Sequence, residues 1–370
     1  MSRYRFLLEH TNLNFFDIPH GKFKSFWTSK KFGFLSSKLE DHSANIFVVN
    51  KSTKFDALFV QNYFNVPFVF LKQETLACID DGTLKKQEEK KLLDAFKTLA
   101  ENNISVVVFP ERNLTVFGEV AKISINITDF LTKLKMTIKF LTIHGPFFEL
   151  PVWAKKQNKC EAKFILHSII KPEKIHGSDS TYINALFNDS MPSSASTYAR
   201  KFPINITTKT RAEGLEKVVY CCPKCKELFS IYSEFNCIKC SNCGTALEID
   251  ENGLIALFNG IEDFDDLSKF QFNELKKLKN LKKPLIQYHN INLLQLSFED
   301  KHKLESKVNV EIFVNKLVYG EKIIKFTEIY DAYLLPDNIL KITLKNGTIF
   351  GLQGETNENL YILVDLLRIK

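Results

Sequence analysis

Two apolar segments, about fifty residues apart, each run directly into a polar turn. Residues 46–49 (IFVV) lead into residues 50–56 (NKSTKFD), and residues 104–109 (ISVVVF) lead into residues 110–115 (PERNLT). A strand that ends in a polar turn and feeds a helix places that turn at the carboxyl edge of a sheet, where open α/β folds keep their sites. Both turns are therefore candidate parts of a functional site.

The pattern around these turns predicts further helices and strands. Residues 57–64 read as a short helix, residues 66–70 and 136–143 as strands, and residues 83–102 as an amphipathic helix. Residues 178–196 are polar and rich in turn formers, so we expect a surface loop there. Strands that alternate with helices predict a mixed α/β sheet flanked by helices.

From about residue 284 the hydrophobic pattern changes to a period of two. Apolar and polar residues alternate over 308–314 and again over 340–344, and the dipeptide Asn346-Gly347 then predicts a type I′ hairpin turn. Residues 356–367 have the spacing of a helix with one apolar face. Strands closed by one C-terminal helix resemble a pleckstrin-homology-like β-sandwich, an analogy of fold that implies no ligand.

The cysteines form the strongest local motif. Six of the eight lie between residues 221 and 243. Cys222 with Cys225 and Cys240 with Cys243 make two knuckles, with fourteen residues between them, close to the spacing of four-cysteine ribbons. Four thiolates close tetrahedrally on Zn²⁺ and leave no open position, so this motif predicts a structural zinc site.

Two further cysteines leave the register of this site open. Cys221 adjoins the first knuckle, and Cys237 is separated from Cys240 by two residues, the same gap as in a knuckle. We favour Cys240 with Cys243, because Gly244 relieves crowding where backbone amides approach sulfur. Cysteines gathered in one module favour a metal site in a reducing compartment over a disulfide framework.

These patterns divide the 370 residues into four parts. We expect an α/β domain with an N-terminal amphipathic segment at 1–215, a zinc ribbon at 216–258, a lysine-rich connector at 259–283, and a β-rich domain with a terminal helix at 284–370. With 45% hydrophobic residues, the chain has enough apolar side chains for a sizeable core.

The charge and the apolar runs limit the partners. A formal net charge of +7 is compatible with an anionic membrane surface or an acidic ligand, and acidic residues around the cysteines argue against nucleic acid. No apolar run is long enough to span a bilayer, and no secretory signal pattern follows the first residues. We therefore expect a cytoplasmic protein, peripheral at the inner face of the cell membrane if it contacts lipid. The aromatic, lysine-rich residues 1–45 suit either the headgroup layer or a helix that covers the core.

The two polar turns carry a family resemblance. "NKSTKFD" followed by "VVVFPERNLT" resembles the glycerolipid (lysophosphatidic acid type) acyltransferase family, whose first block is Asn-His-x-x-x-x-Asp and whose third is Phe-Pro-Glu-Gly-(Thr/Asn)-Arg. Gly145 and residues 151–153 (PVW), followed by the cysteine module, resemble the bacterial branch that carries a zinc ribbon after the catalytic domain. The resemblance covers roughly residues 20–260.

The sequence departs from these blocks at three positions. Lys51 stands in place of the histidine, Arg112 in place of the glycine, and Leu114 in place of the arginine. The residues that match are Asn50, Asp56, Phe109, Pro110 and Glu111.

The resemblance implies a catalytic set of Lys51, Asp56 and Glu111. In the family the histidine takes a proton from the acceptor hydroxyl as it attacks an acyl thioester, and the aspartate orients that histidine. Lysine, with an ordinary pKa of about 10.4, is almost entirely charged near pH 7, and Asp56 favours the charged form further. We therefore predict an ion pair between Lys51 and Asp56 and absent or greatly slowed acyl transfer. We do not expect His42 or His144 to replace the base, because a lone histidine is more often structural.

The phosphate-binding role of the third block is open to two interpretations. Residues two apart in an extended segment share a face, so Arg112 reaches toward the space that the family's arginine serves, and Lys51 adds a second cation for an acceptor phosphate. Alternatively, Arg112 pairs with Glu111 or another carboxylate.

Two functions of different classes follow. The first is a phospholipid-biosynthetic acyltransferase of the 1-acylglycerol-3-phosphate O-acyltransferase type, which moves a fatty acyl chain from acyl-CoA or acyl carrier protein to a lysophospholipid. The second is a pseudoenzyme, a catalytically inactive relative that binds lipid, acyl carrier or protein as a scaffold.

Overall fold

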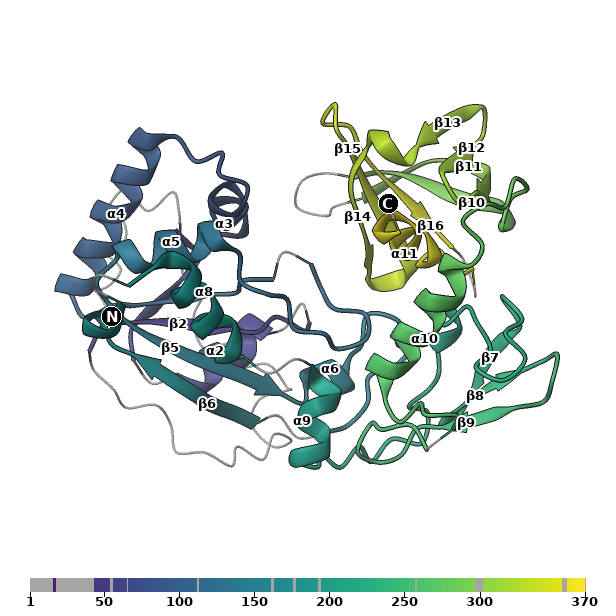
Figure 1. The fold of residues 1–370 in the computed structure, drawn as a ribbon, viewed down its shortest axis with the longest axis horizontal. Coiled ribbons are helices and arrows are strands. Elements are labelled where there is room, and N and C mark those ends of the chain that lie inside the picture. Colours follow the sequence, from purple (N-terminus) through teal and green to yellow (C-terminus); the bar gives the residue numbers. More distant parts are fainter. Residues whose placement is uncertain are drawn as a thin grey trace. The chain divides into compact units, whose positions relative to one another are not determined.

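The computed structural model describes most of the chain, in two compact units (Figure 1). The described residues are 16–17, 43–53, 56–64, 66–111, 113–160, 163–175, 178–191, 194–256, 258–296, 302–354 and 358–369. Unit 1 comprises Met1–Asn113, Glu119–Phe147 and Cys160–Tyr198. Unit 2 comprises Leu114–Gly118, Phe148–Lys159 and Ala199–Lys370. Most of the aromatic N-terminal segment predicted over 1–45 lies outside the described residues.

Unit 1 is built on a six-stranded mixed sheet, as the sequence pattern predicts. Its strands are β1 (Phe16–Asp17), β2 (Asn45–Val49), β3 (Phe68–Leu71), β4 (Ser105–Val108), β5 (Thr137–His144) and β6 (Lys163–Ile170), in the order β1-β3-β4-β2-β5-β6. The four central strands run parallel, whereas β1 and β6 pair antiparallel at the two edges. The carboxyl ends of the adjacent strands β4, β2 and β5 therefore share one edge of the sheet.

Helices accompany the strands of unit 1 because alternate strand residues are buried on both faces. The helices are α2 (Asp56–Tyr63), α3 (Gln73–Asp80), α4 (Lys86–Glu101), α5 (Ile125–Lys133), α6 (Pro146–Glu149), α7 (Pro172–Ile175), α8 (Ser180–Asp189) and α9 (Ala195–Lys201). Val48 belongs to a core cluster shared with α3, α4, α5 and α8, whereas Val49 belongs to a cluster shared with α2. The side chains of β2 therefore contribute to the hydrophobic core on both faces of the sheet.

The prediction of a surface loop over 178–196 is wrong. Asp179 caps α8 by accepting hydrogen bonds from the backbone amides of Thr181 (2.7 Å) and Tyr182 (3.3 Å). Ile183 and Phe187 lie one turn apart and are buried, and the Phe187 ring packs against Phe140 of β5 with centroids 5.1 Å apart. Polar residues on the solvent side hid a helix whose buried side chains are only Ile183 and Phe187.

The cysteine-rich part of unit 2 contains a three-stranded antiparallel sheet and two helical elements. The elements are the 3-10 helix η1 (Leu215–Lys217), strands β7 (Ile231–Glu234), β8 (Cys237–Cys240) and β9 (Ala246–Glu248), and helix α10 (Phe264–Lys276). Asp263 begins α10 by accepting a hydrogen bond from the amide of Asp266 at 3.0 Å. This helix occupies half of the segment that the sequence suggests is a connector.

The remainder of unit 2 is a seven-stranded antiparallel sheet closed by a helix. Its elements are β10 (Ile286–Leu296), β11 (His302–Ile312), β12 (Lys316–Tyr319), β13 (Lys322–Lys325), η2 (Phe326–Glu328), β14 (Ile329–Leu335), η3 (Pro336–Asn338), β15 (Ile339–Leu344), β16 (Ile349–Gln353) and α11 (Ile362–Arg368). The strand order is β13-β12-β11-β10-β16-β15-β14. A four-strand meander and a three-strand meander are thus joined where the first strand pairs with the last.

The hairpin predicted at Asn346-Gly347 is present, but the turn type is different. Gly347 has φ of 85°, whereas Asn346 does not have positive φ, which a type I′ turn requires. The amide of Gly347 donates to the carbonyl of Leu344 at 2.9 Å, and the amide of Leu344 donates to Thr348 at 2.9 Å. The loop is therefore three residues long, with glycine at its left-handed position.

Within the described residues, none of the helices has both the length and the apolar character that crossing a bilayer requires.

Candidate functional site

The two polar turns identified in the sequence lie side by side. Strands β2 and β4 are parallel neighbours, with Val48 paired to Val108, so the segments that follow them leave the same edge of the sheet. Asn50 and Lys51 follow β2, and Pro110 and Glu111 follow β4 and Phe109. The sheet thus brings together residues that stand sixty positions apart in the chain.

Asn50 braces the first turn against strand β5. Its Oδ1 accepts a hydrogen bond of 2.6 Å from the amide of Ile143, and its Nδ2 donates to the Ile143 carbonyl at 3.3 Å. The same Nδ2 donates to Oγ of Ser52 at 3.0 Å. Asn50 is buried, so its amide takes the place of strand pairing where β2 ends. Its role in this structure is to hold the turn in place.

Asp56 closes the first turn from the start of α2. Its Oδ2 accepts hydrogen bonds from the backbone amides of Ser52 and, at 2.8 Å, Thr53, while Oδ1 accepts from the Thr53 hydroxyl at 2.8 Å. The residue is 1% exposed. Burial raises the pKa of Asp56 to about 6, although these donors and the charge of Lys51 oppose the shift. The carboxylate is therefore engaged by its own turn.

Glu111 joins the second turn to the first. Its Oε2 accepts a hydrogen bond of 2.9 Å from the backbone amide of Lys51. Its Oε1 is buried and has no hydrogen-bond partner among the described residues. Burial raises the pKa of Glu111 to about 8, and the negative charge of Asp56 adds to the increase. At neutral pH most molecules therefore carry a proton on this carboxyl.

The charge of Lys51 acts on both carboxyls. Its positive charge lowers the pKa of both Asp56 and Glu111, as a smaller effect than burial. The side chain is half-buried. The three residues of the predicted catalytic set are therefore neighbours in space, and the ion pair between Lys51 and Asp56 stays a prediction.

Other predicted residues lie elsewhere or are not described. Arg112 and His42 lie outside the described residues. His144 ends β5 immediately after the residue that Asn50 braces, and it is buried with its ring centroid 5.0 Å from that of Tyr198. It thus lies at the same edge of the sheet as the first turn.

Sequence reasoning did not identify a polar cluster next to His144. The Nε2 of His167 lies 2.6 Å from the Thr142 hydroxyl and 2.9 Å from the Tyr198 hydroxyl. Strand β6 supplies the histidine, β5 the threonine and α9 the tyrosine. No spacing rule connects three residues from three elements, so only the fold reveals this cluster.

Gln73 was also not identified. At the start of α3, its Nε2 donates to the carbonyl of Phe109 at 3.2 Å, beside Glu111. Its Oε1 is buried and, like Oε1 of Glu111, has no hydrogen-bond partner among the described residues. The side chain therefore fixes the start of the second turn.

The four cysteines that the sequence favours form one cluster in unit 2. The ligand atoms of Cys222, Cys225, Cys240 and Cys243 lie within 4.8 Å of one another. Two Sγ–Sγ pairs, Cys222 with Cys243 and Cys225 with Cys240, are each separated by 3.7 Å. Tetrahedral Zn–S bonds of about 2.3 Å imply sulfur separations of about 3.8 Å. The thiols thus fit a closed four-sulfur metal site.

The backbone explains why these four cysteines converge and why Cys237 does not join them. The amide of Lys226 donates to the Cys222 carbonyl at 2.9 Å, and the amide of Gly244, with φ of 69°, donates to the Cys240 carbonyl at 3.0 Å. Both knuckles therefore curl tightly. Cys237 and Cys240 stand three apart in strand β8 and point to opposite faces, which excludes Cys237 from the cluster.

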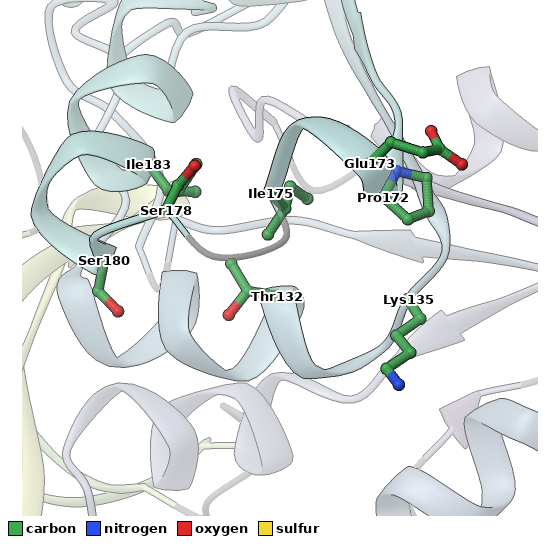
Figure 2. A pocket seen from close by; sticks show the side chains of 8 residues that line it. All are labelled: Thr132, Lys135, Pro172, Glu173, Ile175, Ser178, Ser180 and Ile183. Carbon is green, nitrogen blue, oxygen red and sulfur yellow. The ribbon is translucent and has the colours of Figure 1, made fainter.

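Unit 1 also contains a pocket distant in sequence from both turns. Figure 2 shows its lining residues, which are Thr132, Lys135, Pro172, Glu173, Ile175, Ser178, Ser180 and Ile183. They come from α5, α7, α8 and the segments that adjoin these helices. None of them belongs to the turns that carry Lys51 and Glu111, so this pocket is separate from the candidate site.

Comparison with solved structures gives partial likenesses. No protein-family model matches this chain, and no curated protein matches it. A crystal structure of the 1-acyl-sn-glycerophosphate (LPA) acyltransferase PlsC from Thermotoga maritima is similar in part, with a TM-score of 0.30 and 16% identity. That similarity covers 40% of this chain and 65% of the other, so the match spans less than two thirds of the length of the Thermotoga protein.

Proposed function

We propose that this protein is an acyltransferase that transfers a fatty acyl group from a thioester donor, acyl-CoA or acyl carrier protein, to a lysophospholipid-type acceptor. The observation that carries the proposal is the bond between the Lys51 amide and Glu111, beside Asp56. It joins the first and third blocks of the family that the sequence resembles, at the edge of the sheet where α/β folds keep their sites.

In this proposal Lys51 and Arg112 bind the acceptor's phosphate. Lys51 places a cation beside two buried carboxyls, and Arg112 follows Glu111 directly in the sequence. Both cations then serve one anionic headgroup. Binding of lysophosphatidate, measured by calorimetry, should weaken in Arg112→Ala and remain unchanged in Lys97→Ala, whose side chain is 77% exposed on α4. Equal affinity for Arg112→Ala and the native protein would exclude this role.

The inactive alternative rests on the chemistry of the first turn. The Asp56 carboxylate is engaged by Ser52 and Thr53, and residue 51 carries an ammonium group in place of an imidazole. A positioned general base contributes roughly 10²- to 10⁴-fold to a rate, so its absence leaves acyl transfer slow. The same turn would then serve binding of lipid, acyl carrier or protein.

Acyl transfer itself separates the two functions. Acyl-CoA and lysophosphatidate are incubated with the purified native chain or with one of the variants Lys51→Ala and Lys51→His. Lys97→His is the matched control. Turnover by the native chain above that of Lys51→Ala supports the enzyme. Turnover by Lys51→His alone supports the inactive relative. No turnover by either chain, with no lysophosphatidate binding, rejects both versions of the lipid-directed proposal.

The remaining assignments concern the metal, the C-terminal domain and location. We infer that the four-cysteine cluster holds structural Zn²⁺, because four sulfurs with no other ligand suit zinc and leave no catalytic position. The strand order and the terminal helix support the pleckstrin-homology-like analogy for the C-terminal sheet.

We propose that the protein is cytoplasmic and peripheral at the inner face of the cell membrane. Flotation with anionic liposomes tests that location, and loss of binding is expected when residues 1–40 are deleted.

A further inference from the structure

The segment that leads into the first cysteine knuckle is buried and forms hydrogen bonds with several other parts of unit 2. Residues Tyr220, Cys221 and Cys222 are completely buried. The carbonyl of Tyr220 accepts a hydrogen bond of 2.7 Å from Phe229, and the amide of Cys222 donates to Glu227 at 3.0 Å. The knuckle turn is therefore built directly on the segment that contains Tyr220.

The phenol of Tyr220 contacts the last helix of the chain. Its hydroxyl donates a hydrogen bond of 2.8 Å to Oδ2 of Asp365 in α11. Asp365 is 0% exposed, and its Oδ1 accepts from Arg368 at 3.2 Å. A buried carboxylate that loses one of its donors loses part of the compensation for its desolvation, so the position of Tyr220 contributes to the stability of α11.

A second set of bonds joins the same segment to α10. The amide of Tyr220 donates to Oε1 of Gln271 at 3.3 Å, and Nε2 of Gln271 donates to the Val218 carbonyl at 3.2 Å. Gln271 is 0% exposed. The Arg368 guanidinium of α11 in turn lies 5.2 Å from the centroid of Phe272 in α10. The knuckle, α10 and α11 thus share one buried network.

Asn359, which precedes α11, forms hydrogen bonds with both the seven-stranded sheet and η1. The amide of Asn359 donates to the hydroxyl of Tyr288 in β10 at 2.8 Å. The Nδ2 of Asn359 donates to the Glu216 carbonyl at 3.0 Å. Displacement of the segment that contains Glu216 and Tyr220 would therefore remove one bond just before α11, at Asn359, and one in the middle of α11, at Asp365.

We propose that a metal ion at the four cysteines locks the C-terminal helix α11 in place, through the Tyr220–Asp365 hydrogen bond. Without the ion, Cys222 and Cys225 are no longer linked through a metal to Cys240 and Cys243. The segment that ends at Cys222 then loses its fixed position. Tyr220 then no longer holds Asp365, and α11 opens from its site on the sheet. The cysteine module is in this sense a metal-dependent switch for the C-terminal domain, independent of acyl transfer.

Hydrogen exchange measured by mass spectrometry on the full chain tests the switch. The protein is compared with bound metal and after chelation, with metal release followed in parallel by a colorimetric indicator. Exchange of the α11 amides should increase roughly tenfold or more on metal removal, while that of β2, β4 and β5 in unit 1 stays unchanged. Unchanged exchange in α11 after confirmed metal release would overturn the proposal, as would an equal increase across unit 1.

A variant separates the lock from the metal site itself. Tyr220→Phe keeps the ring and removes only the hydroxyl, so it should retain its metal and still show faster exchange in α11. Tyr232→Phe, at a position that is 43% exposed on β7, is the matched control and should behave like the native chain. Native exchange in α11 of metal-loaded Tyr220→Phe would show that the hydrogen bond carries no coupling and would overturn the proposal.

Discussion

The backbone amide of Lys51 donates a hydrogen bond of 2.9 Å to the side chain of Glu111, so the turn after β2 and the turn after β4 are joined directly. Glu111 is 3% exposed. A buried glutamate in this position fixes the backbone of residue 51, whichever side chain that residue carries. The contact between the two turns is therefore compatible with lysine at position 51.

Replacing Glu111 should separate the effect of its charge from that of its hydrogen bond. Glu111→Gln keeps an acceptor oxygen and resembles the protonated carboxyl, so its free energy of unfolding should stay close to native near pH 4, where Glu111 is protonated in the folded and the unfolded state. Glu111→Ala leaves the Lys51 amide without this partner and should cost about 1–3 kcal/mol. Urea denaturation measures both, with Glu101→Ala, an exposed position on α4, as the control. Equal destabilisation by Gln and Ala would contradict this account.

Stability should fall as pH rises through the neutral range. The folded pKa of Glu111, about 8, lies above its ordinary value of 4.5, and that of Asp56, about 6, lies above 3.8. Between the ordinary and the folded pKa of each carboxyl, the folded state binds more protons than the unfolded state. The contribution of these two carboxyls to stability is therefore complete below about pH 4 and is lost toward pH 8. Each carboxyl contributes a slope of at most about 1.4 kcal/mol per pH unit.

The pH effect is measured as the free energy of unfolding from pH 5 to pH 9. Glu111→Gln removes one of the two titrations, so its curve should be flatter than the native curve between pH 5 and pH 8. Stability that increased with pH over this window in the native chain would mean that these carboxyls are ionised more easily when folded, against the burial argument.

The sequence predicted those features that depend on neighbours along the chain. The buried strands β2 and β4 follow from short apolar runs, and the four-cysteine cluster follows from knuckle spacing and from Gly244, whose φ is 69°. The hairpin near Gly347 was predicted for the same reason, although two turn types share its sequence signal and the structure has the longer loop.

Features that depend on contacts between distant residues were not predictable in this way. Helix α8 was missed because its buried Phe187 packs on Phe140, which lies more than forty positions away. The bond from Lys51 to Glu111 and the cluster around His167 each join strands through the order of the sheet. A single sequence contains no local signal for that order.

Removal of the Asp56 carboxylate should destabilise the first turn. In Asp56→Ala, the amides of Ser52 and Thr53 lose their acceptor in a buried place, which should lower the free energy of unfolding by about 2–4 kcal/mol. Asp56→Asn keeps one carbonyl oxygen as an acceptor and should cost less than half as much. Chemical denaturation of both variants measures the difference, and a similar cost for each would indicate that charge, and not the accepted bonds, stabilises the turn.

Gly214 should tolerate no side chain. Its φ is 103°, and a Cβ there would lie 2.1 Å from the carbonyl oxygen of Trp153. Gly214→Ala must therefore displace the backbone and should destabilise unit 2 by more than about 2 kcal/mol. Gly260→Ala is the matched control, because φ is 79° but no atom lies within 4 Å, so only conformational strain of about 1–2 kcal/mol is expected. Thermal unfolding that ranked the two variants equally would contradict the steric argument.

Substitution of single cysteines should identify the ligands of the metal. We expect one zinc ion per chain by elemental analysis of native protein, because the cluster provides four thiolates and no further ligand. Cys222→Ser should lose the ion or bind it at least tenfold more weakly, since serine is a poor zinc ligand. Cys237→Ser should keep native stoichiometry, because Cys237 lies on the opposite face of β8 from Cys240. Loss of zinc in Cys237→Ser with retention in Cys222→Ser would assign the second knuckle differently and move the ion away from the segment that holds Tyr220.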